Sequence, residues 1–528
     1  MQKKTQGTVV KSRRQVLNKG YSYGGANTTK NVFKGYKATS GSPYEDIDKN
    51  NYTLRQRSRE LYMTAPLATS AIDTNVVHAI GDGLRLCSVV DADILGWSEE
   101  QANAWQNKTN KEFKLWAEDK QMCDYKGIND FYDMQNIAAT AWLASGDVLA
   151  IKKWTQPTAM KPYGLKIDLV EADLCASPNS TFGSKIKAPI GINKNNGNEI
   201  YDGVEVDENG RIVAYHFCNK YPFSYDTFSK KLEWNRVPAY GETGLPLVYH
   251  VLKGERPSQY RGVPFLAKII EPLLQIKRYT ESELETAVIE SFFTAFIETD
   301  SPEVAFTDTM GISDGDSEDD EEISLGPGMM HKLKTGEKVN FVDPKRPNSG
   351  FAPFLTAMCT QLGAAIGEPA EVLEKRFNSS YSAARAALIE AWVTFKLYRI
   401  WFVADFNNPI YEAWLTEAVA IGRISAPGFF TDPIIRKAYL GAKWIGSSAG
   451  QLDPLKEVNA QKIAVESGFT TREQATAELN GGSYLDNVHT LSHENPLIVH
   501  ANVGLTTSNV ITVESEDEDA EHDNKENR

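Results

Sequence analysis

The sequence has little cysteine and no long apolar run. Its 528 residues include five cysteines, no two of them closer than 36 positions and none in a C-x-x-C pair. This count and spacing exclude a zinc ribbon and a disulfide framework, and they predict a reducing compartment. No stretch approaches the length of a membrane span, and no apolar segment follows the basic start, so we expect neither a membrane helix nor a secretory signal.

Nucleotide-binding and metal-binding motifs are also missing. The chain contains no G-x-x-x-x-G-K-[ST] loop, and Gly81-Asp82-Gly83 lacks the third glycine of a dinucleotide loop. The eight histidines form no H-E-x-x-H, and none has a Cys or carboxylate partner at ligand spacing on a helix. We therefore expect no cofactor and no metal site, and any energy-driven step requires an ATPase on a partner protein.

Positive charge is in deficit. With 56 Lys+Arg against 70 Asp+Glu the formal charge is −14, which argues against a protein that wraps nucleic acid through a dense basic face. The same charge is compatible with a protein past which DNA must slide. The acidic block 314–322 is predicted to be a solvated charge run, with loose divalent-ion binding as the alternative.

Helical and strand periodicities both occur, so the expected fold class is α+β. Helical spacing on both sides of Pro66 predicts two consecutive helices, with Thr64 as the N-cap of the second. Asn209-Gly210 predicts the turn of a β-hairpin. Further helices are expected at 99–120, 128–144, 272–298, 351–366, 380–405, 409–422 and 453–468, and strands at 84–90, 148–154, 164–170, 200–206, 212–218, 247–253, 329–335 and 338–343.

Two amphipathic helices flank the acidic, turn-rich stretch. The first, 272–298, is expected to be one helix of roughly 40 Å. The second ends at Gly367, with Pro369 beyond it. This order predicts a stalk with a cap. The next helix, 380–405, is apolar almost all round, so it should be buried by its own chain or by neighbours.

One motif suggests an enzyme. Gly446-Ser447-Ser448-Ala449-Gly450 matches the G-x-S-x-G nucleophile elbow, which needs a helix directly after its second glycine. Here Gln451-Leu452 intervenes, and no triad Asp and His follow in a plausible sheet. A small-residue loop is the favoured interpretation, and a serine hydrolase using Ser448 is the alternative.

The connection between the second and third long helices carries two cations. Lys375 and Arg376 are followed by small polar residues, among them Asn378 and Ser379. Such a loop could touch phosphates briefly without reading sequence. The alternative is that these are ordinary surface residues.

Several separate segments together resemble the portal proteins of lambda-like tailed bacteriophages. They keep one order from residue 54 to about residue 460. The family commonly has Gly-Glu where this chain has Gly146-Asp147, and the acidic block looks like an insertion. The resemblance rests on Leu54, Arg55, Arg57, Ser58, Arg59, Pro66, Leu67, Ala71, Ile72, Gly81 and Gly83, on 200–216, on 236–239 leading to His250, on 255–270 with Arg256, Pro257, Gln259, Arg261, Gly262 and Pro264, and on 325–347, 381–388 and 453–460.

The resemblance implies a structural protein with no catalysis of its own. Portal proteins form a ring, commonly a dodecamer, at one capsid vertex, and double-stranded DNA is packaged and ejected through it. The implied partners are the terminase large subunit, the major capsid protein and head-completion or connector proteins. The implied location is the virion, after assembly in the host cytoplasm. A DNA-binding scaffold is a further alternative.

The resemblance also implies a ring subunit with an α/β wing, a long-helix stem, a small α/β clip and a helical crown. Lys375, Arg376, Asn378 and Ser379 would then face DNA from a tunnel loop. The implied parts are a flexible basic arm (1–50), wing (51–263), stem helix (264–298), clip with the acidic insertion (299–349), second stem helix (350–367), tunnel loop (368–381), wing return helices (382–440), crown (441–485) and acidic disordered tail (486–528).

Overall fold

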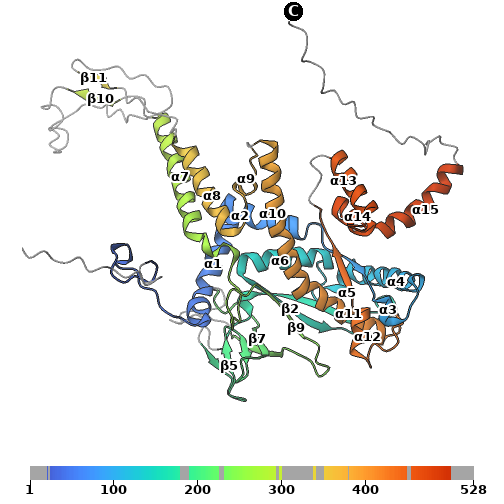
Figure 1. The fold of residues 1–528 in the computed structure, drawn as a ribbon. Coiled ribbons are helices and arrows are strands. Elements are labelled where there is room, and N and C mark those ends of the chain that lie inside the picture. Colours follow the sequence, from blue (N-terminus) through green and yellow to red (C-terminus); the bar gives the residue numbers. More distant parts are fainter. Residues whose placement is uncertain are drawn as a thin grey trace, which may run out of the picture.

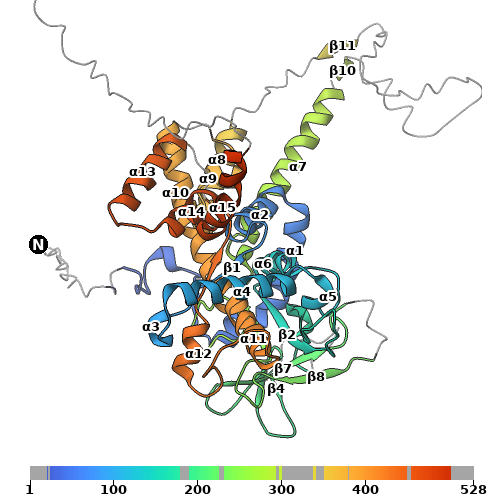
Figure 2. The same ribbon diagram turned by 90° about the vertical axis from the view of Figure 1, so that its right-hand side faces the viewer.

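The computed structural model has a broad body of helices and sheets from which one long helix, α7, projects (Figures 1 and 2). This mixture confirms the predicted α+β class. The structure describes residues 21, 24–178, 190–224, 231–292, 296–299, 337–340, 350–377, 380–448 and 454–500.

The α-helices account for about half of the described residues. Their bounds are α1 (Lys49–Thr64), α2 (Pro66–Ala79), α3 (Ala92–Leu95), α4 (Glu99–Ala117), α5 (Lys120–Cys123), α6 (Phe131–Ser145), α7 (Ile270–Phe292), α8 (Phe351–Ile366), α9 (Ala370–Glu374), α10 (Tyr381–Phe402), α11 (Asn408–Ala420), α12 (Pro433–Tyr439), α13 (Pro454–Glu466), α14 (Arg472–Asn480) and α15 (Tyr484–His500).

The described strands form four antiparallel sheets, with the orders β3-β2-β9, β4-β5-β6-β7-β8, β1-β12 and β10-β11. The first two sheets lie in the body and the last lies at the far end of α7 (Figure 1). Their bounds are β1 (Arg85–Ser88), β2 (Asp147–Trp154), β3 (Leu165–Glu171), β4 (Gly191–Ile192), β5 (Glu199–Tyr201), β6 (Val204–Val206), β7 (Ile212–Cys218), β8 (Trp234–Pro238), β9 (Val248–Leu252), β10 (Phe296–Thr299), β11 (Glu337–Asn340) and β12 (Ala442–Ile445).

The break between α1 and α2 lies one residue later than predicted. Thr64 is the last residue of α1, where its hydroxyl donates to the Glu60 carbonyl (2.8 Å), so it is not the N-cap. Ala65 takes that position with extended backbone. The physical reason is the ring of Pro66, which forces the residue before it out of the helical region.

The predicted hairpin is confirmed. Strands β6 and β7 pair antiparallel around Asn209-Gly210, with the Gly210 N–H donating to the Asp207 carbonyl (2.9 Å). The strand predicted at 200–206 is divided into β5 and β6, because Asp202 and Gly203 both take positive φ and turn the chain. Edge strand β8 was not predicted, since its mostly exposed residues lack alternation.

The end of the N-terminal arm belongs to the body. Residues Tyr44–Asp48 form a helical turn that leads into α1, and Ile47 and Asp48 are buried. The prediction of a flexible arm over 1–50 is therefore wrong for residues 44–50. Burial, and next the nearby Asp202 carboxylate, raise the pKa of Asp48 to about 7.

The first stalk helix is shorter than predicted. Helix α7 ends at Phe292, and Phe296–Thr299 form a strand paired with β11, so the expectation of helix through 298 is wrong there. Aromatic and β-branched residues at 296–299 favour a strand once a partner strand is available. Strand β11 was predicted; the strand expected at 329–335 and the acidic block 314–322 lie outside the described residues.

The C-terminal region is more ordered than predicted. Helices α14 and α15 follow the expected α13, so the prediction of a disordered tail is wrong for residues 486–500. Strand β12, which would begin the crown, pairs with β1 of the wing instead. Residues 501–528 lie outside the described part of the chain.

A buried ion network joins distant parts of the body. The Arg261 side chain is fully buried, and its guanidinium bonds both oxygens of Asp147 (2.7 and 3.2 Å) and contacts Asp202 (2.9 Å). Arg55 of α1 also bonds Asp202 (3.1 Å). Burial alone would raise the pKa of Asp147, but the charges of Arg261 and Arg55 hold it well below its usual range.

This network requires the backbone at Gly262 to lie very close to the backbone at Gly146. The Gly262 N–H donates to Asp147 (3.0 Å), and the Asn51 amide donates to the Gly262 carbonyl (3.0 Å). A Cβ atom on Gly262 would lie 1.8 Å from the Gly146 carbonyl oxygen, so only glycine fits. The Gly146-Asp147 and Arg261-Gly262 pairs, noted separately in the sequence, therefore form one joint between α1, β2 and the approach to α7.

Candidate functional site

The candidate site is the connection between α8 and α10. Helix α8 ends as predicted, with Gly367 in the left-handed conformation (φ 79). The connection was predicted to be loop-like over 368–381, which is wrong for residues 370–374, because these form helix α9. Helix α10 then starts after Ser380, whose hydroxyl accepts the Ala383 N–H (3.4 Å).

Helix α9 is docked on α2. Its apolar residues Val372 and Leu373 are buried. The Ser70 hydroxyl of α2 donates to the Leu373 carbonyl (2.8 Å), and the Asn75 amide donates to the Glu368 carboxyl group. The first half of the connection is thus fixed to the body by packing and by two hydrogen bonds.

Glu368 sits at the base of this connection and is 2% exposed. Burial raises its pKa to about 8, although the Asn75 hydrogen bond and the charge of Lys375 pull it down. The carboxyl group is therefore mainly protonated at neutral pH, which avoids a buried anion. A Cβ on Gly363 would lie 2.2 Å from the Glu368 carbonyl oxygen, so α8 approaches this turn closely.

We predict that Glu368→Gln removes a pH dependence of stability. The folded chain holds the Glu368 proton more tightly than the unfolded chain, whose pKa is near 4.5. The free energy of unfolding should therefore fall as pH rises from that value to about 8, by about 1.4 kcal/mol per unit of pKa difference. Chemical denaturation of both proteins on either side of this window measures it.

Asp48 and Asp405, whose pKa values are also raised, contribute equally to both proteins in this comparison. Only the difference between the two pH profiles therefore reports on Glu368. Parallel profiles would contradict a protonated Glu368.

The two predicted cations lie at the end of α9. Lys375 closes the helix in the left-handed conformation (φ 53), and the Arg376 N–H donates to the Glu371 carbonyl (3.0 Å). Both side chains are exposed. The structure therefore leaves both cations exposed at the end of α9. Asn378 and Ser379 lie outside the described residues.

The surroundings of these cations are not basic. A groove of about 1130 Å³ between α8, α9 and α10 includes Arg376 in its lining, together with the acidic side chains of Glu371, Glu374 and Glu390. On the other side, burial and the charge of Lys375 lower the pKa of His78, whose ring stacks on Phe395 at 4.8 Å. Two exposed cations beside an acidic groove can attract a phosphate backbone without binding it tightly.

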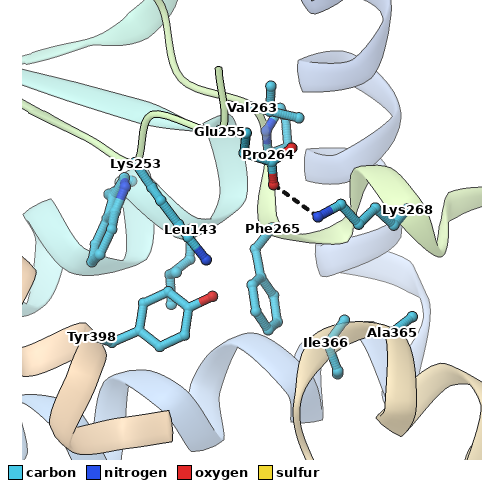
Figure 3. Close-up of a pocket in the computed structure, with 11 residues that line it drawn as sticks. Leu143, Lys253, Glu255, Val263, Pro264, Phe265, Lys268, Ala365, Ile366 and Tyr398 are labelled. Atoms are coloured by element: carbon cyan, nitrogen blue, oxygen red, sulfur yellow. Dashed lines mark hydrogen bonds and ion pairs between the residues drawn. The ribbon is translucent and has the colours of Figure 1, made fainter. Parts of the chain in front are cut away.

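A small cavity lies where α7 and α8 join the body. It encloses about 90 Å³ between Phe265, Ile366 and Tyr398, and Lys268 forms an ion pair with Glu255 (2.8 Å) at its edge (Figure 3). The Lys253 ammonium lies 4.5 Å from the Trp401 ring. A space this small holds a few waters at most, so it is a structural joint and not a ligand site.

In the described part of the G-x-S-x-G segment, Ser448 has a backbone carbonyl and not a histidine as its hydrogen-bond partner. The Ser448 hydroxyl donates to the Leu479 carbonyl (3.4 Å), and Arg399 donates to the Ser447 carbonyl (2.8 Å). Among the described residues no histidine lines the adjacent groove. Ala449 and Gly450 lie outside the described part of the chain.

Two further features are absent from the described residues. No group of three or more His, Cys, Asp or Glu side chains there is arranged to hold a metal ion. No helix there is both long and apolar enough to cross a membrane.

The comparison with known proteins decides the family. Residues 29–399 match the model of "Phage portal protein, lambda family". The chain belongs to the lambda family of phage portal proteins. The predicted portal family and portal function are therefore confirmed, and the virion is where such proteins reside.

Curated relatives are portal proteins as well. Portal protein B of Escherichia phage lambda is 22% identical over 484 residues, covering 87% of this chain and 86% of the relative. The portal protein of Escherichia phage N15 is 21% identical over 87% of each chain. The probable portal protein of Halomonas phage phiHAP-1 is 24% identical over 81% of this chain and 77% of its own.

The comparison with solved structures matches chains from gene transfer agent (GTA) particles. A chain of the neck of the native particle, computed with C12 symmetry, is 11% identical with a TM-score of 0.40, covering 82% of this chain and 94% of that chain. A chain of the native virion gives 12% identity and a TM-score of 0.39, covering 81% and 93%.

Proposed function

We propose that this portal protein assembles into a dodecameric ring at one capsid vertex and that double-stranded DNA enters and leaves the capsid through its central channel. The observation that carries the proposal is the family match, which runs from residue 29 to residue 399 and so covers α1 to α9 and most of α10. No catalytic step belongs to this role, and the hydrolase alternative gains no support from Ser448.

Exposed apolar side chains support assembly. Leu284 and Val288 of α7 are 66% and 48% exposed, and Ile389, Val393 and Ile400 lie uncovered along α10. A single subunit leaves these residues in water at a free-energy cost. In a ring each helix gains neighbours from two adjacent subunits, which can cover such stripes.

Within this proposal the subunit consists of a wing, a stem, a clip and a crown. Residues 51–263 and 382–440 form the wing, α7 and α8 the stem, and the paired strands β10 and β11 belong to the clip. Helices α13, α14 and α15 form the crown. The clip is the proposed contact for the terminase large subunit and later for connector proteins. The wing is the proposed contact for the major capsid protein. The proposed place of assembly is the host cytoplasm.

The connection 368–381 is the proposed tunnel loop. Lys375 and Arg376 would contact passing phosphates, with Asn378 and Ser379 beside them. The acidic side chains of the neighbouring groove would repel DNA and so keep these contacts brief. A DNA-binding scaffold would need a continuous basic face instead, and the groove beside the two cations is acidic.

Electron microscopy of the purified protein in negative stain tests the ring directly. We expect particles with a central hole, and a mass in solution that is a multiple of the 58.7 kDa subunit. A monodisperse monomer at all accessible concentrations would contradict the proposal.

A further inference from the structure

A pocket lined by lysines lies on the body, away from the connection between α8 and α10. It encloses about 400 Å³ between α5, the turn that joins β2 to β3, and the start of β3. Lys126, Lys161 and Lys166 line it, together with neutral residues only: Gln121, Tyr125, Gly127, Thr155, Gln156, Thr158 and Tyr163. Such a concentration of positive charge is unexpected in a chain with a net charge of −14.

Neutral acceptors hold two of these ammonium groups in place. The Lys166 Nζ donates to the backbone carbonyl of Gln121 (2.6 Å), and the Lys161 Nζ donates to the side-chain carbonyl of the same residue. Among the described residues neither lysine has a carboxylate partner, whereas Lys126 contacts Asp168 at 3.2 Å. An ammonium has three N–H donors, so both groups keep donors for an anion.

The nearby aspartate carboxylates accept hydrogen bonds from backbone N–H groups. Asp119 accepts the Gln121 N–H (2.8 Å), Asp124 accepts the Ile128 N–H (2.8 Å), and Asp130 caps α6 through the Asp133 N–H (2.8 Å). These bonds fix the carboxylates in the turns on which they lie. None of these three carboxylates forms an ion pair with Lys161 or Lys166, so an anion from outside this region can pair with the two lysines.

Large exposed side chains lie on the segments that line the pocket or next to those segments in the sequence. Tyr125, Ile128 and Trp154 are all at least half exposed, and Met160, next to Lys161, is 89% exposed. Exposed aromatic and methionine side chains beside cations are typical of a surface that binds protein. A site for a free phosphate or for a nucleic acid backbone does not require them.

The chain itself carries a segment with the matching chemistry. In the C-terminal region, Val510, Ile511 and Val513 come directly before 514–523, where seven of ten residues are acidic. This region follows α15, which ends at His500, and the 14 to 23 residues from there to 514–523 can span roughly 50–80 Å when extended. The other acidic block, 314–322, lies between β10 and β11, and both views place these strands farther from α5 than α15 is (Figures 1 and 2).

We propose that the lysine pocket binds the acidic C-terminal segment 510–523 of this chain, with Lys161 and Lys166 pairing with its carboxylates and Trp154 and Met160 covering its valine and isoleucine side chains. The contact places one of the most acidic segments of the chain on a basic surface of the wing. Because the pairing is between exposed charges, it should be sensitive to salt.

Carbodiimide cross-linking of the full-length protein tests this contact, because the reagent joins ammonium and carboxylate groups that touch. We expect peptides that link Lys161 or Lys166 to 514–523, in yields about tenfold above those of the exposed control lysines Lys111 and Lys437, and we expect these links to disappear at about 1 M salt, where the Debye length is about 3 Å. The Lys268–Glu255 pair, at 2.8 Å within the folded body, is the internal standard and should react in both conditions.

A double variant, Lys161→Ala with Lys166→Ala, should abolish the links to 514–523 and leave the Lys268–Glu255 link unchanged. Links from 514–523 spread evenly over exposed lysines would overturn the proposal. Links from the pocket to 314–322 would also overturn it, as would suppression of the pocket links by a short DNA duplex but not by a synthetic 510–523 peptide. The wild-type result decides the question even if the double variant does not fold.

Discussion

Replacing Arg261 with alanine is expected to lower the free energy of unfolding by about 3–5 kcal/mol, because the change leaves buried carboxylates without their nearest cation. Asp147 is fully buried and loses two hydrogen bonds, and Asp202 loses an ion pair at 2.9 Å. The backbone carbonyls of Ala172 and Cys175, which accept from the same guanidinium (2.8 Å each), also lose their donor. Chemical denaturation followed by tryptophan fluorescence measures the loss.

A surface arginine from the same segment is the matched control. Arg256 pairs with Asp46, but both side chains are about half exposed, so Arg256→Ala should cost at most about 1 kcal/mol. Arg261→Lys keeps the charge but not the planar fork, and it should fall between the two. Equal effects of Arg261→Ala and Arg256→Ala would contradict a central role for the network. If Arg261→Ala is insoluble, Arg261→Lys still provides the measurement.

The parts of the fold that the sequence predicted are those set by local patterns. The structure confirms the helical period of α8, its end at Gly367 and the turn at Asn209-Gly210. Each of these features depends on residues that are close together in the sequence. The boundary at Thr64 was wrong by one residue because the ring of Pro66 holds Ala65, and not Thr64, in extended backbone. The prediction of helix over the residues of β10 was wrong because the partner strand, β11, lies about forty residues further along the chain.

The network around Arg261 could not have been predicted in the same way. Arg55 and Asp202 are 147 positions apart, and Arg261 and Asp147 are 114 apart. Within its own segment, each of these charged residues looks like an ordinary surface or turn residue. Only the packing of α1, β2 and the approach to α7 brings the charges together and buries them.

At the candidate site the sequence predicted the two cations but not the helix, α9, that carries them. Lys375 and Arg376 were predicted on a loop-like connection, and the structure places them at the end of α9. A signal for α9 was present, because Pro369 directly precedes the helix-forming residues of 370–374. Its docking on Ser70 and Asn75 of α2 was not readable, since these partners lie about 300 positions earlier.

Removing both cations is expected to slow DNA packaging about tenfold, which corresponds to about 1.4 kcal/mol on the limiting step. The variant combines Lys375→Gly with Arg376→Ala. Glycine is chosen at 375 because the positive φ there strains any other small residue, so the backbone of the connection should stay in place. The measurement is the amount of nuclease-protected DNA that forms per unit time in a packaging reaction with purified proheads and terminase.

Rings of this variant should look normal in negative stain, because both side chains are exposed and outside the buried contacts of α9. Two controls separate charge from other effects. Exchanging the cations, Lys375→Arg with Arg376→Lys, should keep packaging near the wild-type rate, since brief contacts with phosphates need charge and not a particular side chain. Removing two exposed lysines elsewhere, Lys111→Ala with Lys437→Ala, should have no effect. Unchanged packaging by the variant without cations would show that these side chains do not act on the DNA, and loss of rings would show that they act in assembly instead.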